Sequence, residues 1–342
     1  MSPKNLNASN KTHKFLLNQL KDKQTSKIYK KFEKNLNLNN NFIVAVSGGP
    51  DSLALSFLAK VYSIKKSLNA RYFLVDHKLR ENSSSEADFV KKILSNLSIK
   101  LEILKWNGIK PKNNIQSIAR AKRYALLKKQ SKKLKINHIL LGHHKDDLIE
   151  NFFIRMLRGS GLNGMISFDE KSVNHGMNII RPLLKFSKND LLFISKKVFN
   201  TYVEDPSNKN KTFQRVKIRS LIKKLHLEGL DTKKFDLTLN NLKFANDSIK
   251  FYIQKNLINN SKTFSNKKSI LLNGEFFNQP EEIVFRSLSE ILRVVGKKYY
   301  PVRGKKINHV VELIKNKSFI KTTLGNCILK RVNNTIIVTK ER

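Results

Sequence analysis

The sequence contains a single cysteine, Cys327, among its 342 residues. One thiol cannot form a disulfide within the chain, a cysteine-based zinc site or a cysteine-ligated iron–sulfur cluster. Long apolar runs are also missing, since no stretch approaches the roughly 20 residues of a transmembrane helix. The first residues are too polar for a secretory signal. We therefore expect a protein of the cytoplasm, or of the equivalent compartment of an organelle, that does not bind membranes.

Acidic residues are scarce as well: 26 Asp and Glu stand against 67 Lys and Arg, which gives a formal net charge of +41. Such a charge favours a polyanionic partner such as nucleic acid. Part of this positive charge reflects an overall composition that is rich in Lys, Asn and Ile. Only 14 of the cations are Arg, so an Arg in this chain is the better indicator of a bidentate phosphate or carboxylate contact.

The remaining composition is that of a folded protein, with 40% hydrophobic residues and a length typical of about two domains. Short apolar runs alternate with amphipathic segments. We predict strands at 42–46, 70–76, 99–106 and 137–142, and helices at 53–64, 84–97, 115–135, 146–158, 188–200 and 213–225. This alternation predicts an α/β fold with a parallel sheet that helices cover on both faces.

The domain layout follows from where this alternation starts and stops. Residues 1–37 are expected to form a basic helical extension, with a helix at 14–35, and residues 38–228 the catalytic domain. A smaller helical or α+β domain is expected at 229–342, helical to about 258 and over 281–296, with a final hairpin that turns at Asn333-Asn334.

A glycine-rich segment, SGGPDS, lies between the first predicted strand and its helix. Adjacent glycines let backbone N–H groups surround an anion, and the helix amino terminus adds donors and a favourable dipole. Asp51 would repel a phosphate unless Mg²⁺ lies between them, which points to a metal-bound nucleotide. The alternative is a simple Gly-Gly turn. The segment is not a Walker A loop, because GxxxxGK[ST] is absent.

The segment GHHKDD follows the predicted strand at 137–142. His143 and Asp147 are four residues apart and would share a helix face, an arrangement that suits a metal or a general base. Alternatively, Asp146 and Asp147 only cap the helix and His144 is solvated. A zinc site with two histidines and one aspartate is a further alternative, although ATP chemistry prefers a metal bound by oxygen.

These segments resemble a known family. SGGPDS resembles the PP-loop of the N-type ATP pyrophosphatases, which have a Rossmann-like fold. Six further segments are similar to those of tRNA(Ile)-lysidine synthases: DHKLRENSS, NIQSIARAKRY, LGHHKDDLIEN, RMLRGSGLNG, RPLL and EDPSNKNKTFQRVKIR. The resemblance covers roughly residues 40–225. It departs at Asn151, where the family usually has Thr, but Asn151 can still form hydrogen bonds.

The resemblance implies roles for individual residues. Asp51 and Asp147 would hold Mg²⁺. The residues expected to act in catalysis are Asp51, His143, Asp147, Arg120 and Arg215. Those expected to bind ATP are Ser47, Gly48, Gly49, Pro50, Asp51, Ser52, His77, Arg80 and Arg219. Three further regions are expected to lie near the site or to contact RNA: Arg123, the loop after Arg155 and Arg158, and the segment at Asp205 and Pro206.

The resemblance also implies a reaction. ATP would adenylate oxygen 2 of the wobble cytidine in a tRNA(Ile) with a CAU anticodon, and L-lysine would then displace AMP at carbon 2. The cofactors would be ATP and Mg²⁺. The basic residues expected to hold tRNA are Lys297, Lys298, Arg303, Lys305, Lys306 and Arg331. A homodimer is compatible with this sequence.

Three alternatives stay open. A tRNA thiolase is disfavoured, because Cys327 alone cannot supply a cysteine pair or hold a cluster. A small-molecule ligase of the amidotransferase type would not account for the charge. A non-catalytic basic RNA-binding protein is disfavoured by the intact polar positions of SGGPDS and HHKDD.

Overall fold

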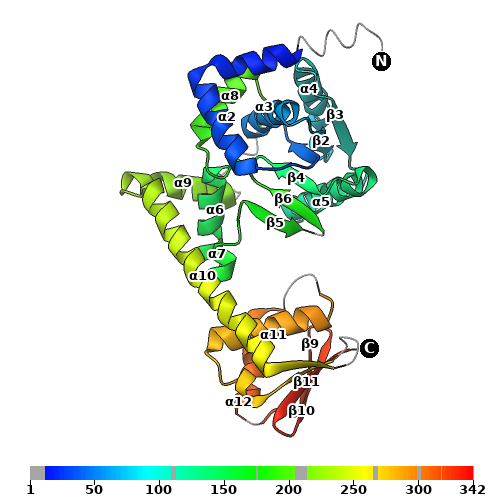
Figure 1. The fold of residues 1–342 in the computed structure, drawn as a ribbon, viewed down its shortest axis with the longest axis vertical. Coiled ribbons are helices and arrows are strands. Elements are labelled where there is room, and N and C mark those ends of the chain that lie inside the picture. Colours follow the sequence, from blue (N-terminus) through cyan, green and yellow to red (C-terminus); the bar gives the residue numbers. More distant parts are fainter. Residues whose placement is uncertain are drawn as a thin grey trace. The chain divides into compact units, whose positions relative to one another are not determined.

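The computed structural model describes residues 12–108, 113–174, 176–204, 214–264, 269–298, 302–316 and 318–341. The chain divides into two compact units, Met1–Leu230 and Asp231–Arg342 (Figure 1). Asp205 and Pro206, which the sequence places near the site, lie outside the described residues. Within the described ranges, no helix combines the length and the apolar character that crossing a membrane requires.

The first unit is built on a six-stranded sheet in the order β3-β2-β1-β4-β6-β5. Its strands are β1 (Phe42–Val46), β2 (Ala70–Asp76), β3 (Leu101–Lys105), β4 (His138–Leu141), β5 (Lys171–Asn174) and β6 (Met177–Ile180). β1 pairs in parallel with β2 and β4, so that Ala45 lies opposite both Phe73 and Leu141. β5 and β6 form an antiparallel hairpin at the edge. The predicted α/β fold is confirmed. The hairpin was not predicted, because its first strand, KSVN, is short and polar.

Helices pack on both faces of this sheet (Figure 1). The helices described in this unit are α2 (Lys23–Leu36), α3 (Pro50–Lys65), α4 (Ser83–Ser95), α5 (Ile115–Leu134), α6 (Lys145–Met156), α7 (Leu162–Met165), α8 (Lys188–Phe199) and α9 (Gln214–Leu227). Successive strand residues point to opposite faces. Val44 therefore packs in the core of α2, α3, α4 and α8, while Ile43 packs with Tyr124 and Leu127 of α5.

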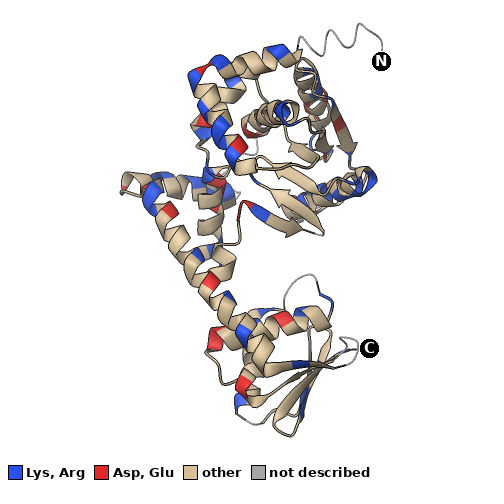
Figure 2. Ribbon diagram, viewed as in Figure 1, with Lys and Arg blue, Asp and Glu red and all other residues tan. Residues whose placement is uncertain are grey.

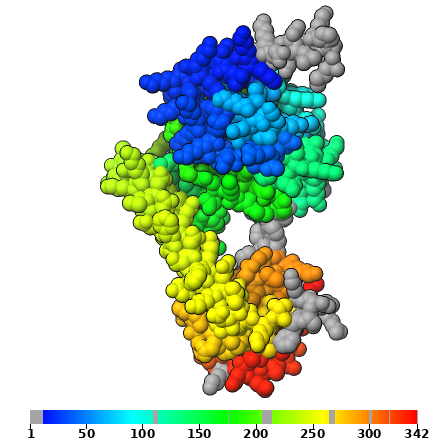
Figure 3. All heavy atoms as spheres, viewed as in Figure 1, coloured from blue at the N-terminus to red at the C-terminus, as the bar shows by residue number. Residues whose placement is uncertain are grey.

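The amino-terminal helical segment belongs to the first of these cores. The chain is helical over residues 12–18, and η1 (Gln19–Lys21) precedes α2. Asp22 interrupts the predicted helix, because its carboxylate accepts the Thr25 N–H at 2.8 Å and starts α2. Ile28, Phe32 and Leu36 are buried on one face of α2. The space-filling view shows this segment, in dark blue, on the surface of the unit (Figure 3).

The second unit combines three helices with an antiparallel sheet in the order β7-β8-β11-β10-β9. Its elements are α10 (Thr232–Asn260), β7 (Ser261–Phe264), β8 (Ser269–Leu272), η3 (Gly274–Phe276), α11 (Glu281–Val295), α12 (Gly304–Lys315), β9 (Lys321–Leu324), β10 (Cys327–Val332) and β11 (Thr335–Lys340). Val332 pairs with Thr335 across the predicted hairpin turn. Leu288, Leu292 and Leu329 are fully buried in its core. The predicted α+β carboxy-terminal domain is confirmed.

Basic side chains are spread over both units, and Figure 2 shows them along α5 and α9 in particular. In the second unit, five of the predicted tRNA-binding residues are exposed: Lys297, Lys298, Arg303, Lys305 and Lys306. Arg331 differs. Its guanidinium donates to the carbonyls of Phe319 at 3.0 Å and Ile314 at 2.7 Å, so it holds the connection between α12 and β9.

Candidate active site

A pocket of about 640 Å³ opens where the carboxyl ends of β1 and β2 meet α4, α5 and α9. Apolar residues such as Leu74, Ala87 and Val90 form part of its wall. Seven residues that the sequence singled out also line it: Ser47, His77, Arg80, Arg120, Arg123, Arg215 and Arg219. The fold thus brings together residues from four segments that lie far apart in the chain. An apolar wall with converging cations suits a base and its phosphates.

The PP-loop joins β1 to α3 by a turn that requires glycine at one position. Gly48 has a φ of +86°, and a Cβ there would lie 2.6 Å from the Val90 side chain. Its carbonyl accepts the Val203 N–H at 3.0 Å. The buried Ser52 hydroxyl accepts the Ser47 N–H at 3.2 Å and donates to the Gly49 carbonyl at 3.0 Å. Ser52 therefore braces the loop from within, while Ser47 faces solvent.

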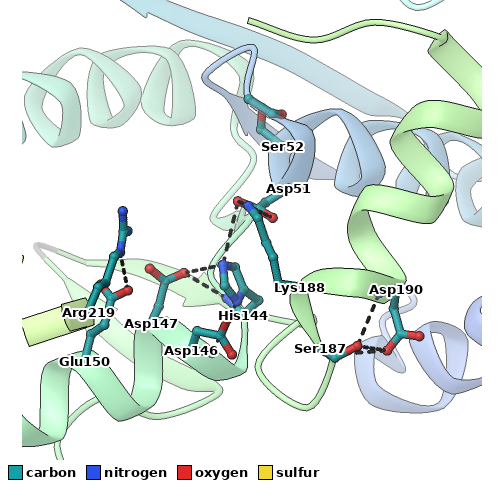
Figure 4. A network of polar contacts seen from close by, with 11 residues as sticks. Asp51, Ser52, His144, Asp146, Asp147, Glu150, Ser187, Lys188, Asp190 and Arg219 are labelled. Carbon is teal, nitrogen blue, oxygen red and sulfur yellow. Dashed lines mark hydrogen bonds and ion pairs between the residues drawn. The ribbon is translucent and has the colours of Figure 1, made fainter. Parts of the chain in front are cut away.

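The carboxylate of Asp51, in the first turn of α3, lies in a network of charged groups (Figure 4). The ammonium of Lys188 contacts both of its oxygens at 2.7 Å. Nε2 of His144 lies 3.7 Å from Oδ2 of Asp51 and 3.7 Å from Oδ2 of Asp147. His144 thus stands between the two carboxylates that the sequence assigns to Mg²⁺.

The start of α6 explains this placement of His144. The helix begins at Lys145, and His144 is its N-cap residue. Nδ1 of His144 accepts the Asp146 N–H at 3.2 Å, while Asp147 accepts the His144 N–H at 3.0 Å. Since Nδ1 is an acceptor, the ring proton of neutral His144 sits on Nε2, toward the carboxylates. His144 is 7% exposed, so the alternative of a solvated His144 is wrong.

His143 lies just before the helix, so it does not share a helix face with Asp147 as its spacing suggested. Its ring packs edge-on against Phe168 at 5.1 Å, and Arg181 lies over the same Phe168 ring at 4.8 Å. Burial lowers the pKa of His143 well below its usual range, although Asp147 opposes the shift. At neutral pH the imidazole is therefore uncharged.

Glu150 and Arg219 form an ion pair beside this network (Figure 4). Glu150 is 3% exposed, and its Oε1 accepts Nε of Arg219 at 2.5 Å. Its Oε2 is buried and has no hydrogen-bond partner among the described residues. Burial raises the pKa of Glu150, although Arg219 opposes the shift. Arg219 also lines the pocket, so the Glu150 carboxylate with which it pairs lies next to this pocket.

The end of β2 contributes His77 and Arg80. The Asp76 carboxylate accepts the Lys78 N–H at 2.9 Å and the Ser84 hydroxyl at 2.7 Å, which fixes the turn. Both ring nitrogens of His77 are buried without a hydrogen-bond partner in the part of the chain that the structure describes. Burial lowers the pKa of His77 to about 4, so the ring is neutral. Arg80 donates to Glu86 at 2.8 Å.

The arginines of α5 and α9 face the same space. The Arg120 guanidinium lies over Tyr124, 5.4 Å from the ring centroid. Arg120, Arg123 and Arg215 take part in none of the ion pairs found within the described ranges. Burial lowers the pKa of Arg123, with Arg120 and Arg215 adding to the shift. Several cations without carboxylate partners favour an anionic ligand in this pocket.

The segment after α6 lies close to α9. Arg158 donates to Gln214 at 2.6 Å, and Arg155 donates to Asn151 at 3.0 Å. Asn151 therefore does form a hydrogen bond, as the sequence suggested. The predicted GSGLNG loop contains the short helix α7.

Comparisons with known proteins show to which family the chain belongs. The sequence model of the PP-loop domain matches residues 19–225. A tRNA(Ile)-lysidine synthase of Wolbachia pipientis wMel is 34% identical over 307 residues, which cover 89% of this chain and 71% of the relative. One of Orientia tsutsugamushi (strain Boryong) is 33% identical over 310 residues, covering 89% and 70%. The chain belongs to the tRNA(Ile)-lysidine synthase family.

Membership of this family makes the chain a ligase whose PP-loop domain binds ATP. Among solved structures, the U34-tRNA thiolase NcsA from Methanococcus maripaludis has a TM-score of 0.54 at 16% identity. The match covers 64% of this chain and 79% of the thiolase chain. At that identity the likeness shows the PP-loop fold alone.

Three residues of the site were not predicted from the sequence: Lys188, His144 and Glu150. The only local signal for Lys188 is its position in the first turn of a helix, where a cation is unfavourable. Glu150 lies one turn after Asp146, and nothing in its spacing showed that it would be buried. All three depend on partners brought together by the fold.

Proposed function

We propose that this chain attaches L-lysine to carbon 2 of the wobble cytidine in a CAU-anticodon tRNA(Ile), at the expense of ATP. One observation carries the proposal: Asp51 of the PP-loop and Asp147 both lie 3.7 Å from His144, and Glu150 pairs with Arg219, one of five arginines that line the pocket. Relatives that carry the name tRNA(Ile)-lysidine synthase support it. The cytoplasm, or the equivalent compartment of an organelle, is the proposed location.

Adenylation requires that the triphosphate be held while oxygen 2 of cytidine attacks the α-phosphate and pyrophosphate leaves. Arg80, Arg120, Arg123, Arg215 and Arg219 are placed to neutralise the phosphates. His77, which is neutral and whose ring nitrogens have no hydrogen-bond partner among the described residues, is proposed to form a hydrogen bond with the nucleoside.

The donor set at Asp51 and Asp147 fits Mg²⁺, which prefers carboxylate oxygens and completes its shell with water and phosphate. When bound there, Mg²⁺ would supply positive charge next to the transferring phosphate. Among the described residues, no three His, Cys, Asp or Glu side chains form a metal-binding cluster. The zinc alternative therefore gains no support from this geometry.

Lysine must lose a proton before its amine attacks carbon 2. His143 is a poor acceptor, because burial depresses its pKa. Glu150 is a better one, since burial raises its pKa and its Oε2 has no hydrogen-bond partner among the described residues. We therefore assign to Glu150 the binding and deprotonation of the lysine ammonium.

Glu150→Gln is expected to raise the KM for lysine and to lower the rate of lysine transfer, each by roughly tenfold or more. ATP binding should change little, because Gln can still accept from Arg219. Steady-state kinetics with lysine and ATP varied separately would check this. Glu33→Gln, an acidic residue on α2 outside the site, is the control. A KM for lysine that stays at the wild-type value would contradict the assignment.

The target base has to leave its stack, which an anticodon loop allows at low cost. We propose that the exposed cations of the second unit hold the tRNA backbone. Arg303→Glu combined with Lys305→Glu should then weaken tRNA binding by roughly tenfold or more at physiological salt and leave the KM for lysine unchanged. A filter-binding titration at two salt concentrations measures this. Equal affinities of variant and wild type would remove this surface from the proposal.

A thiolase reaction is the second candidate, but Cys327 does not suit it. Its thiol is fully buried in the core of the second unit, and burial raises its pKa to about 11. A buried, protonated thiol is a poor sulfur carrier.

The decisive experiment is transfer of radiolabelled lysine to an unmodified CAU tRNA(Ile) transcript in the presence of ATP and Mg²⁺. A transcript with another base at the wobble position is the control. Label on the first transcript alone, with equal release of AMP, is the expected result. AMP formation without label would point to another nucleophile. Folded protein that gives neither label nor AMP would favour the non-catalytic RNA-binding alternative.

A further inference from the structure

Lys188 connects two parts of the first unit that are 137 residues apart in the sequence. It lies in the first turn of α8, and its ammonium contacts both oxygens of Asp51 at 2.7 Å (Figure 4). The side chain of Lys188 is 36% exposed and that of Asp51 is 24% exposed. The pair is therefore partly shielded from water but open to an incoming ligand.

The start of α8 holds Lys188 in this position. The Ser187 hydroxyl and the Asp190 carboxylate form a capping box, in which Asp190 N–H donates to Ser187 at 3.2 Å. Leu191 and Ile194 anchor the same helix in the core that contains α3. A cation in the first turn of a helix opposes the helix dipole. Its placement there is compensated by the pair with Asp51.

The pair occupies the carboxylate that the proposed reaction needs for Mg²⁺. Both oxygens of Asp51 already have Lys188 at hydrogen-bond distance, and His144 Nε2 lies 3.7 Å from Oδ2. A divalent cation that approaches Asp51 meets the positive charge of Lys188 at the same place. The ammonium must move away before the cation can bind with full strength.

We propose that Lys188 occupies the place of the metal on Asp51 in the nucleotide-free protein, and transfers to phosphate oxygens when the nucleotide and metal bind together. This inference rests on the proposed function, since it assumes that the PP-loop binds ATP with Mg²⁺. The negative charge of Asp51 is then balanced in both states, by Lys188 in the nucleotide-free protein and by the metal when the nucleotide is bound. Metal without nucleotide binds weakly, because nothing then receives the displaced ammonium.

The alternative is a purely structural pair that fastens α8 to the PP-loop. It makes a different prediction. Removing a structural pair lowers stability and leaves the affinity for metal unchanged or weaker, whereas removing a competing cation strengthens metal binding.

The test compares Lys188→Met, Lys188→Gln and Lys188→Arg with wild type. Lys185→Met is the matched control, because Lys185 is a nearby exposed lysine, paired with Glu170 at 2.6 Å. Mn²⁺ serves as the probe, and the electron paramagnetic resonance signal of free Mn²⁺ reports binding. Each titration is run without nucleotide and with a non-hydrolysable ATP analogue. Circular dichroism confirms that each variant is folded.

Without nucleotide, Lys188→Met and Lys188→Gln are expected to bind Mn²⁺ about tenfold more tightly than wild type, a change of about 1.4 kcal/mol. Lys188→Arg and Lys185→Met should resemble wild type. With Mn²⁺ present, the two uncharged variants should bind the analogue roughly tenfold more weakly, because a phosphate contact is lost.

Unchanged or weaker Mn²⁺ binding by both uncharged variants, with wild type binding the analogue normally, would overturn this inference and leave the proposed function intact. Wild type that fails to bind the analogue together with Mn²⁺ would overturn the proposed function, and the inference with it.

Discussion

Asp51→Ala is expected to abolish adenylation, with a loss of roughly a thousandfold or more in ATP-dependent AMP formation. In the proposed site this carboxylate is one of two that would hold Mg²⁺, and Asp147 alone would hold the metal only weakly. Binding of tRNA should stay within about twofold of wild type, because Asp51 lies at the amino terminus of α3 beneath the loop. Pyrophosphate release and tRNA filter binding measure the two effects separately.

The control for this prediction is Asp231→Ala. Asp231 is also a carboxylate at a helix amino terminus, but it lies in the second unit, where it caps α10 and accepts the Lys233 N–H at 2.8 Å. Its removal should cost about 1 kcal/mol of unfolding free energy and leave AMP formation near the wild-type rate. If Asp51→Ala loses tRNA binding and turnover in equal measure, Asp51 has a structural role instead.

Gly48→Ala is expected to lower the free energy of unfolding by roughly 2–4 kcal/mol and to remove measurable ATP binding. Gly48 has a φ of +86°, and the added Cβ would lie 2.6 Å from the side chain of Val90. Val90 is 1% exposed and cannot move aside freely. The loop would therefore change its conformation, and the N–H groups that are proposed to bind the phosphates would change direction.

Gly49→Ala is the matched control one residue later. Gly49 has a φ of −71°, and a Cβ there meets no atom within 4 Å. Its unfolding free energy should stay within about 0.5 kcal/mol of wild type. Thermal denaturation of both variants, with and without ATP, checks the contrast. Equal destabilisation by the two substitutions would show that the loop does not depend on the conformation of Gly48.

The central sheet could be predicted because strands such as β1, FIVAV, are buried on both faces and read as continuous apolar runs. SGGPDS, DHKLR and GHHKDD lie close together because parallel strands carry them to one edge of the sheet. The hairpin β5–β6 could not be predicted, since half of its eight residues are polar and its second strand joins the sheet by pairing with β4, which is distant in the sequence.

The candidate site was predicted less completely than the fold. Several arginines could be predicted as site residues because Arg is rare in this chain, and most of the predicted arginines line the pocket. Lys188 is one of many lysines, and only the packing of α8 against α3 identifies it. His143 and His144 are adjacent, and only the first residue of α6 decides which of them stands between the carboxylates.

The burial of Cys327 has a practical consequence. The chain has no other thiol, and this one is fully inaccessible with a pKa of about 11. Maleimides and mild oxidants should therefore leave the folded enzyme unmodified and active. A cysteine introduced at a chosen surface position would then be the only site that reacts, so one fluorophore or spin label can follow ligand-induced motion in an otherwise native protein.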